Sequence, residues 1–313
     1  MYFPYLRGKQ FELLALRELA EELKGEYNFT PIVEPVKTTL TGLKTAIVSM
    51  LNHNLRFALI LNPSDGDFRY VSNIDIIEHL NVLAENKEKW CPAFIYKDNQ
   101  VEAIKNTIDK HKLDNVMIIC MESINVNNSL LSDLLNDKSV KYITVSDGDS
   151  RMIMRKLFNS YRSKNFIRLD DNFREATRNA DYSLQEDESF TEQHLFYKED
   201  GFYGLADFTA LSKHFVEGGM LPYAIAIHLI YQRDDGAINI HHFVSDTNDD
   251  RSNIQGKFFE AANKVKSFYT SGHFKTSAVD EIIRLIEEER YPGLGYIKKL
   301  SIKNSIQLMN NIL

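Results

Sequence analysis

The alternation that decides the fold is clearest in residues 140–171, VKYITVSDGDSRMIMRKLFNSYRSKNFIRLDD. The β-branched and aromatic run at 142–145 predicts a strand, and the spacing of apolar residues in 152–161 predicts a helix. A second strand-like run, 166–169, follows this helix. A strand, a helix and a further strand within about 30 residues are typical of a βαβ unit, whose two strands are parallel. The stretch therefore indicates a parallel sheet.

The same alternation covers the N-terminal two thirds of the 313-residue chain. Eight strand-like runs occur there, most of them followed by a segment of helical period, at residues 2–6, 32–36, 57–61, 93–96, 116–121, 142–145, 166–169 and 202–206. Eight units match a (β/α)8 barrel better than an open doubly wound sheet of about five or six strands. We therefore predict an α/β fold, a TIM-barrel-like parallel barrel over residues 1–215, with an open sheet as the alternative.

Three segments near the end of the predicted barrel are less regular. Residues 172–179 and 208–215 predict helices after the seventh and eighth strands, the first with a weak period. Residues 181–191 are acidic and polar and have no period, so they predict a surface loop.

After residue 215 the pattern changes from alternating to antiparallel. Two strand-like runs, 224–232 and 237–244, are joined by a turn that ends in Asp235 and Gly236, which predicts a β-hairpin. Three helical segments follow, at 258–269, 279–289 and 297–313. No glycine-serine linker precedes them, so we expect residues 216–313 to pack on the barrel as a hairpin and helical cap.

Composition limits the classes of function. Lys plus Arg is 37 and Asp plus Glu is 44, and this net charge of -7 argues against direct nucleic-acid binding through general electrostatics. Cys91 and Cys120 are too few for a disulfide scaffold or a four-thiolate zinc site. No run of about 18 apolar residues occurs. We expect a cytoplasmic protein without a membrane association.

The common catalytic and nucleotide motifs are missing. The sequence contains no phosphate-binding loop, no GxGxxG after a strand, no GxSxG elbow and no HExxH. The adjacent His241 and His242 would point to opposite faces of a strand, so the pair does not form one metal site. Whether the protein is an enzyme, and whether it holds a metal, is therefore left open by the motifs.

Polar residues gather instead at the predicted strand ends, where barrel enzymes build their active sites. They are Arg7, Lys9, Glu34, Lys37, Asn62, Lys97, Glu122, Asp147, Asp149, Asp170, Asp171 and Asp207. Five of the eight strand ends carry a carboxylate. If these groups converge, a divalent cation or the basic residues Arg7, Lys9, Lys37 and Lys97 would neutralise them. Arg7, Lys9 and Lys37 would also bind an anionic ligand.

Two of the carboxylates lie among apolar residues. Glu34 lies between Val33 and Pro35, and Asp207 lies between Ala206 and Phe208. A poorly solvated carboxylate is costly unless it is paired or used, so both are candidate catalytic residues. His228, in the apolar run 224–230, is a third candidate, and its alternative is a core histidine that satisfies a backbone carbonyl. Asp147 and Asp149 are better explained as helix caps or solvated turn residues.

Several short stretches resemble the phage beta-protein family, and more closely its sce-type bacterial relatives. They are MYFPYLRGKQFE at 1–12, PIVEPV at 31–36, LADF at 205–208, Gly-Gly at 218–219, Ile-His at 227–228 and His-Phe at 242–243. The chain has Phe208 where the phage branch has a Gly-Asp-Tyr form, and this removes a tyrosine hydroxyl.

This resemblance implies a site and a genetic setting but no reaction. The implied site residues are Lys9, Glu34, Asp207, His228 and His242. The implied setting is phage defence, beside a nuclease-like protein partner. Glu34 and Asp207 are also the two carboxylates that are candidates because they lie among apolar residues.

Two classes of function remain in competition. In the first, the protein is a hydrolase or phosphodiesterase, with or without a metal. Its catalytic residues are Glu34, Asp207 and His228. The residues that bind a small anionic substrate or nucleotide are Arg7, Lys9, Lys37 and His242. In the second, it is a non-catalytic ligand-binding or scaffold subunit of a nuclease-containing defence complex. The first requires the predicted hairpin to lie over or beside the barrel mouth, so that His228 approaches Asp207.

Overall fold

The structure, a computed structural model, describes residues 1–71, 74–146, 148–218 and 221–313. Eight parallel strands form a closed barrel in the order β1-β2-β3-β4-β5-β6-β7-β9. They are β1 (Tyr2–Leu6), β2 (Ile32–Val33), β3 (Phe57–Ile60), β4 (Trp90–Ile95), β5 (Val116–Ile119), β6 (Val140–Ser146), β7 (Asn165–Asp170) and β9 (Gly204–Asp207). The predicted TIM-barrel-like fold is confirmed, and the open sheet is excluded.

The barrel wall separates two apolar layers. Because side chains alternate along a strand, Phe3 and Tyr5 of β1 point into the barrel, whereas Tyr2 and Leu6 point outward to the helices. The inner layer contains Ile32, Ile60, Ile119 and other buried side chains, so the barrel is a packed core that opens only at its ends.

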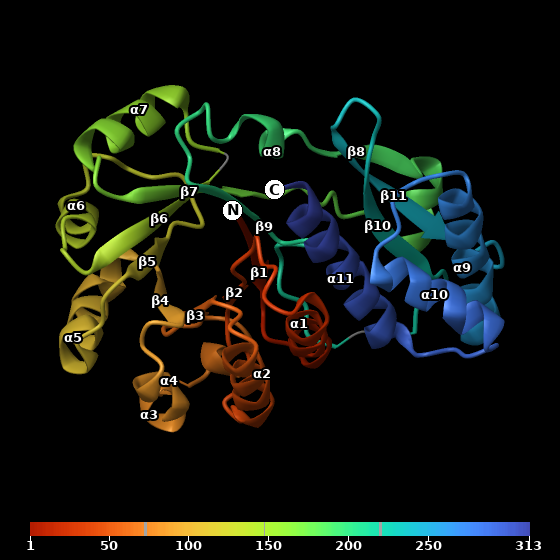
Figure 1. Ribbon diagram of the computed structural model, residues 1–313, viewed down its shortest axis with the longest axis horizontal. Helices are drawn as coiled ribbons and strands as arrows, with labels where there is room; N and C mark the ends of the chain where they lie inside the picture. The colour runs from red at the N-terminus through yellow and green to blue at the C-terminus, as the bar shows by residue number, and fades with distance from the viewer. Residues whose placement is uncertain (72–73, 147, 219–220) are drawn as a thin grey trace.

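Helices follow the first six strands and surround this part of the barrel (Figure 1). They are α1 (Gln10–Leu23), α2 (Thr41–Asn52), α3 (Ile76–His79), α4 (Val82–Glu85), α5 (Val101–His111), α6 (Ser129–Leu135) and α7 (Arg151–Ser160), with short 3-10 turns η1 (Gly66–Arg69) and η2 (Asp98–Gln100). Among the described residues, no helix is long and apolar enough to cross a membrane.

The segment between β7 and β9 differs from the sequence-based expectation. Residues 172–178 are not helical, and η3 (Asn179–Leu184), β8 (Asp187–Thr191) and α8 (Gln193–Phe196) follow. The surface loop predicted for 181–191 is therefore wrong. β8 pairs antiparallel with β11 (Ile238–Val244), and its acidic side chains face histidines of that strand. Their partners are distant in sequence, so the local pattern resembles a solvated loop.

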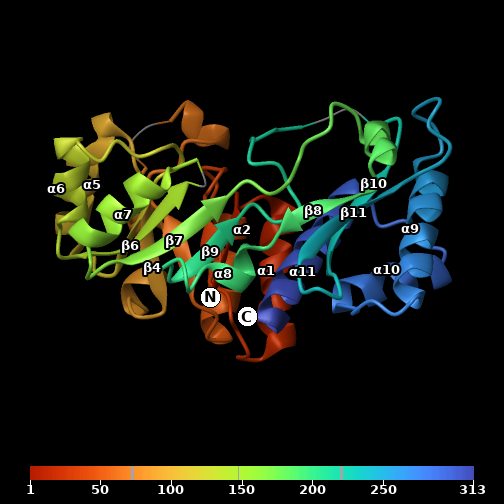
Figure 2. The ribbon, with the colours of Figure 1, turned by 90° about the horizontal axis from the view of Figure 1, so that it is seen from above.

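The predicted hairpin and the helices after it are present. β10 (Ala226–Gln232) pairs with β11 in an antiparallel hairpin, and α9 (Ile254–Thr270), α10 (Ser277–Glu287) and α11 (Leu294–Ile312) follow. In Figures 1 and 2 the second sheet, α9 and α10 lie beside the barrel, with α11 between them and it.

The C-terminal helix completes the outer layer of the barrel. The helix predicted for 208–215 is not formed, and Thr209 has a left-handed φ of 57°, which interrupts a helix at its start. Instead, α11 packs against α1 and β1. The buried Lys299 and Lys303 of α11 lie 2.8 Å from carboxylate oxygens of Glu18 on α1, so ion pairs bind this helix to the barrel.

Candidate functional site

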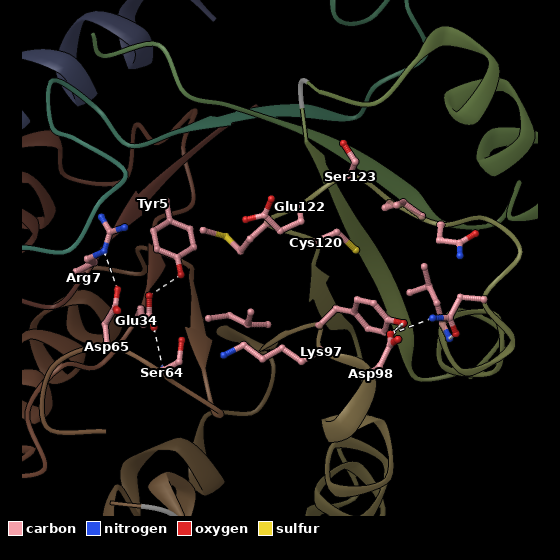
Figure 3. Close-up of a pocket in the computed structure, with 17 residues that line it drawn as sticks. Tyr5, Arg7, Glu34, Ser64, Asp65, Lys97, Asp98, Cys120, Glu122 and Ser123 are labelled. Carbon is pink, nitrogen blue, oxygen red and sulfur yellow. Dashed lines mark hydrogen bonds and ion pairs between the residues drawn. The ribbon is translucent and has the colours of Figure 1, made fainter. Parts of the chain in front are cut away.

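A cavity of about 490 Å³ lies at the end of the barrel where the strands finish, and we call it the mouth cavity. Figure 3 shows the side chains that line it. Apart from Tyr5, which lies within β1, its ionisable groups follow strands β1 to β5 in the chain, at the face where barrel enzymes hold their substrates. They are Tyr5, Arg7, Glu34, Asp65, Tyr96, Lys97, Asp98, Cys120 and Glu122.

Glu34 lies at the base of the mouth cavity. Ile32 points into the barrel and Val33 points out, so the alternation of β2 directs Glu34 inward, where it is 2% exposed. The Tyr5 hydroxyl donates to Oε2 at 2.7 Å, and the Ser64 backbone N–H donates to Oε1 at 3.1 Å. Burial raises the pKa of the Glu34 carboxyl, although these two hydrogen bonds act in the opposite direction. Glu34 is therefore fixed in place and has an increased affinity for a proton.

Arg7 forms another wall of the cavity. Its Nε lies 3.2 Å from Asp65 Oδ2, and its Nη1 donates to the backbone carbonyl of Ser212 at 3.3 Å. The guanidinium carbon lies 5.3 Å from the centre of the Phe208 ring. These contacts hold Arg7 rigidly, and Asp65 neutralises part of its charge.

Lys97 and Glu122 are the ionisable groups of the mouth cavity that are available to a ligand. Both are exposed, and neither side chain forms a hydrogen bond or ion pair with another described residue. Figure 3 shows the Lys97 side chain extending across the cavity toward Ser64, which itself donates to Glu34. Both residues are strand-end residues in the sequence, but nothing in their local sequence separates a ligand-binding side chain from a solvated turn residue.

Two predicted ligand-binding residues have protein partners. The Lys9 ammonium donates to the Val216 carbonyl at 2.8 Å and lies 4.5 Å from the centre of the Phe215 ring. Lys37 pairs with Asp67 at 3.2 Å and also with Glu217. These lysines bind the segment that follows β9, and neither lines the mouth cavity.

Asp207 lies on the other side of the barrel wall from Glu34. It follows the inward-pointing Ala206 by one residue, so its side chain points outward to Tyr2. It accepts from the Tyr2 hydroxyl at 2.5 Å, from the Thr209 N–H at 2.8 Å and from Asn172 Nδ2 at 3.3 Å. Burial raises the pKa of this carboxyl, and these hydrogen bonds oppose the effect. The structure therefore does not bring Asp207 and Glu34 together.

His228 and His242 lie outside the mouth cavity as well. Their Nδ1 atoms are 2.7 Å apart across the hairpin, and His242 Nε2 lies 3.0 Å from Glu188 Oε1 on β8. His228 lines a second, larger cavity between the barrel and the C-terminal sheet. Glu188 could not be predicted as a partner of His242, because the two residues are 54 positions apart in the sequence.

One group of possible metal ligands is found among the described residues, and it is remote from the mouth cavity. Asp75, Glu78 and His111 have ligand atoms within 4.8 Å of one another, on α3, the residue before it, and the end of α5. The Lys110 ammonium lies 2.7 Å from both Asp75 and Glu78, so a protein cation already neutralises this group. Asp147, a candidate strand-end carboxylate, lies outside the described residues.

Comparisons with known proteins do not assign the chain to a family. No protein-family model matches the sequence, and the search of curated proteins gives no significant match. The resemblance to the phage beta-protein family stays a hypothesis that rests on the short motifs.

Proposed function

We propose that the protein is a hydrolase that acts on a small anionic substrate in the mouth cavity. One observation carries the proposal: the buried Glu34 carboxyl, whose pKa is raised, lines the same cavity as the Lys97 ammonium, which has no acidic partner among the described residues. A proton acceptor beside a free cation suits general acid–base catalysis on a phosphate or carboxylate compound.

The residues have separate roles in this reaction. Lys97 binds the negative charge of the substrate, and Arg7 adds a fixed positive charge to the cavity wall. The ionised Glu34 takes a proton from a water molecule, whose oxygen bonds to the electrophilic carbon or phosphorus. The bond to the leaving group breaks, and the leaving group takes the proton from Glu34. This step needs no metal, so the metal-assisted form of the reaction is not part of the proposal.

The test is turnover of a panel of phosphomonoesters, phosphodiesters and carboxylate esters. We expect the wild type to hydrolyse a member of the panel, Glu34→Gln to lower kcat by about 10²- to 10⁴-fold, and Lys97→Gln mainly to raise KM. Glu281→Gln is the matched control, because Glu281 is a nearly buried carboxylate of α10 outside the mouth cavity, and it should keep kcat within a few-fold.

Two outcomes would contradict the proposal. Turnover that survives Glu34→Gln would remove the general base. Binding of anions by the wild type without turnover of any panel member would favour the non-catalytic alternative, in which the mouth cavity serves a ligand-binding subunit of a defence complex.

A further inference from the structure

The larger cavity has a volume of about 1300 Å³ and lies between the barrel and the C-terminal sheet. The loop after β7 contributes Phe173, η3 contributes Tyr182, β10 contributes His228, and α11 contributes Lys298. Figures 1 and 2 show these elements side by side at the junction of the two parts. The cavity has room for a ligand of nucleotide size or larger.

A chain of hydrogen bonds determines which nitrogen of His228 is free. Glu188 is a carboxylate and only accepts, so His242 Nε2 donates to it and carries the hydrogen. Neutral His242 then has a lone pair on Nδ1, and the 2.7 Å contact between the two rings requires His228 Nδ1 to donate. His228 Nε2 is left as an acceptor, and it has no partner among the described residues.

The surroundings of the two rings favour these neutral forms. The His242 side chain is fully buried, and Glu188 is 8% exposed and paired with Arg174 at 3.3 Å. Burial lowers the pKa of His242, against the effect of Glu188. Burial, together with the nearby Lys298 ammonium, lowers the pKa of His228 well below its usual range. The hydrogen bonds from Glu188 through His242 therefore keep the hydrogen of His228 on Nδ1 at neutral pH.

The cavity is also basic. Arg178, Arg251 and Lys298 line it, against the carboxylates Glu175 and Asp249. Arg178 and Lys298 have no ion pair with a described residue, whereas Glu175 accepts from the Ser212 hydroxyl at 2.7 Å. Cations without partners in a large cavity are typical of a site for a phosphate or carboxylate group.

Aromatic surface borders the same space. The half-exposed Tyr223 lines the cavity, and the Arg251 guanidinium lies 4.9 Å from the centre of its ring. An aromatic ring beside a cation is a stacking surface for a planar ligand.

We propose that this cavity is a second binding site that takes a nucleoside phosphate with an amino-substituted base. The phosphate lies against Arg178 and Lys298, the base stacks near Tyr223, and an N–H of the base donates to His228 Nε2. A nucleotide supplies the anion, the planar ring and the N–H donor that these three features require. The inference does not depend on the mouth cavity or on the hydrolysis proposed there.

The test is calorimetric titration of the full chain with AMP, with adenosine and inorganic phosphate as partial ligands. We expect saturable binding of AMP and weaker binding of each partial ligand. His228→Phe removes the acceptor and keeps a ring beside Phe173, and it should weaken AMP binding about 3- to 10-fold. Lys298→Gln should weaken it by a similar factor.

Two controls distinguish this site from the mouth cavity. His241→Gln changes the neighbouring histidine, which pairs with Asp187, and Lys97→Gln removes the anion-binding ammonium of the mouth cavity; both should bind AMP as the wild type does. Spectra of the wild type labelled with ¹⁵N-histidine should show the Nδ1–H tautomer of His228 and a change at Nε2 when AMP is added. Absence of AMP binding, an unchanged His228 signal, or equal loss of binding in the controls would overturn the proposal.

Discussion

Replacing Glu34 by glutamine tests whether its carboxyl is as costly to bury as its environment indicates. Glutamine has almost the same shape, its Oε1 can accept from the Ser64 N–H, and its amide can donate to the Tyr5 hydroxyl. The substitution therefore weakens at most one hydrogen bond, a loss of about 1 kcal/mol in the free energy of unfolding. It also removes the cost of an ionised group that is 2% exposed.

The sign of the pH dependence follows from the raised pKa. Below the ordinary value of 4.5 the wild-type carboxyl is protonated in both the folded and the unfolded chain, so only the hydrogen-bond loss separates the two proteins. As the pH rises from 4.5 through the raised pKa of the folded protein, the wild type loses stability that Glu34→Gln keeps. At acidic pH the free energy of unfolding of the variant should be about 1 kcal/mol below that of the wild type. As the pH rises toward neutral, the variant should become more stable relative to the wild type, and above the pKa of folded Glu34 the difference between the two should stay constant.

Urea unfolding between about pH 4 and pH 8 measures this difference. The single tryptophan, Trp90, is buried in β4 and gives a fluorescence signal of barrel unfolding. The assigned environment of Glu34 would be refuted if the difference in unfolding free energy between the two proteins did not change with pH. It would also be refuted if the variant became less stable relative to the wild type as the pH rises.

Three further substitutions test other parts of the structure. Partial burial raises the pKa of Asp75, but hydrogen bonds from Lys110 and His111 outweigh this effect and lower the pKa to about 2. Asp75→Asn should therefore lower the free energy of unfolding at neutral pH by about 1 kcal/mol, a value reduced by solvent screening. That cost should fall away below pH 3.8, toward pH 2, in acid unfolding curves. Lys303→Met should destabilise the protein by about 2 kcal/mol and speed proteolytic cleavage near α11, because Glu18 and Glu22 lose a buried cation. Asp207→Asn should change the unfolding free energy by no more than about 1 kcal/mol and leave turnover intact, since the side chain faces away from the mouth cavity; loss of turnover with normal unfolding would return Asp207 to the site.

The barrel could be predicted because its signal is local. Strands buried on both faces leave short apolar runs, and eight of these runs separated by helical segments leave few alternatives. The hairpin was similarly predictable from Asp235 and Gly236 at its turn. Strand β8 could not be predicted in this way, because its acidic residues are stabilised by histidines about 50 residues away in the sequence.

The candidate site shows a further limit of sequence reasoning. Glu34 and Asp207 have the same local signal, a carboxylate between apolar residues, yet they lie on opposite sides of the barrel wall. Glu34 is two residues after the inward-pointing Ile32, whereas Asp207 is one residue after the inward-pointing Ala206. A one-residue difference in register reverses the direction of a side chain, and only the structure determines that register.

The central claim is that the mouth cavity binds the anionic group of a substrate between Lys97 and the base Glu34. A crystal structure of the protein soaked with inorganic phosphate tests it most directly. Our account predicts an oxyanion in the mouth cavity within hydrogen-bond distance of Lys97 Nζ, and loss of that oxyanion in Lys97→Gln crystals. An empty mouth cavity in crystals that hold phosphate elsewhere would contradict the account.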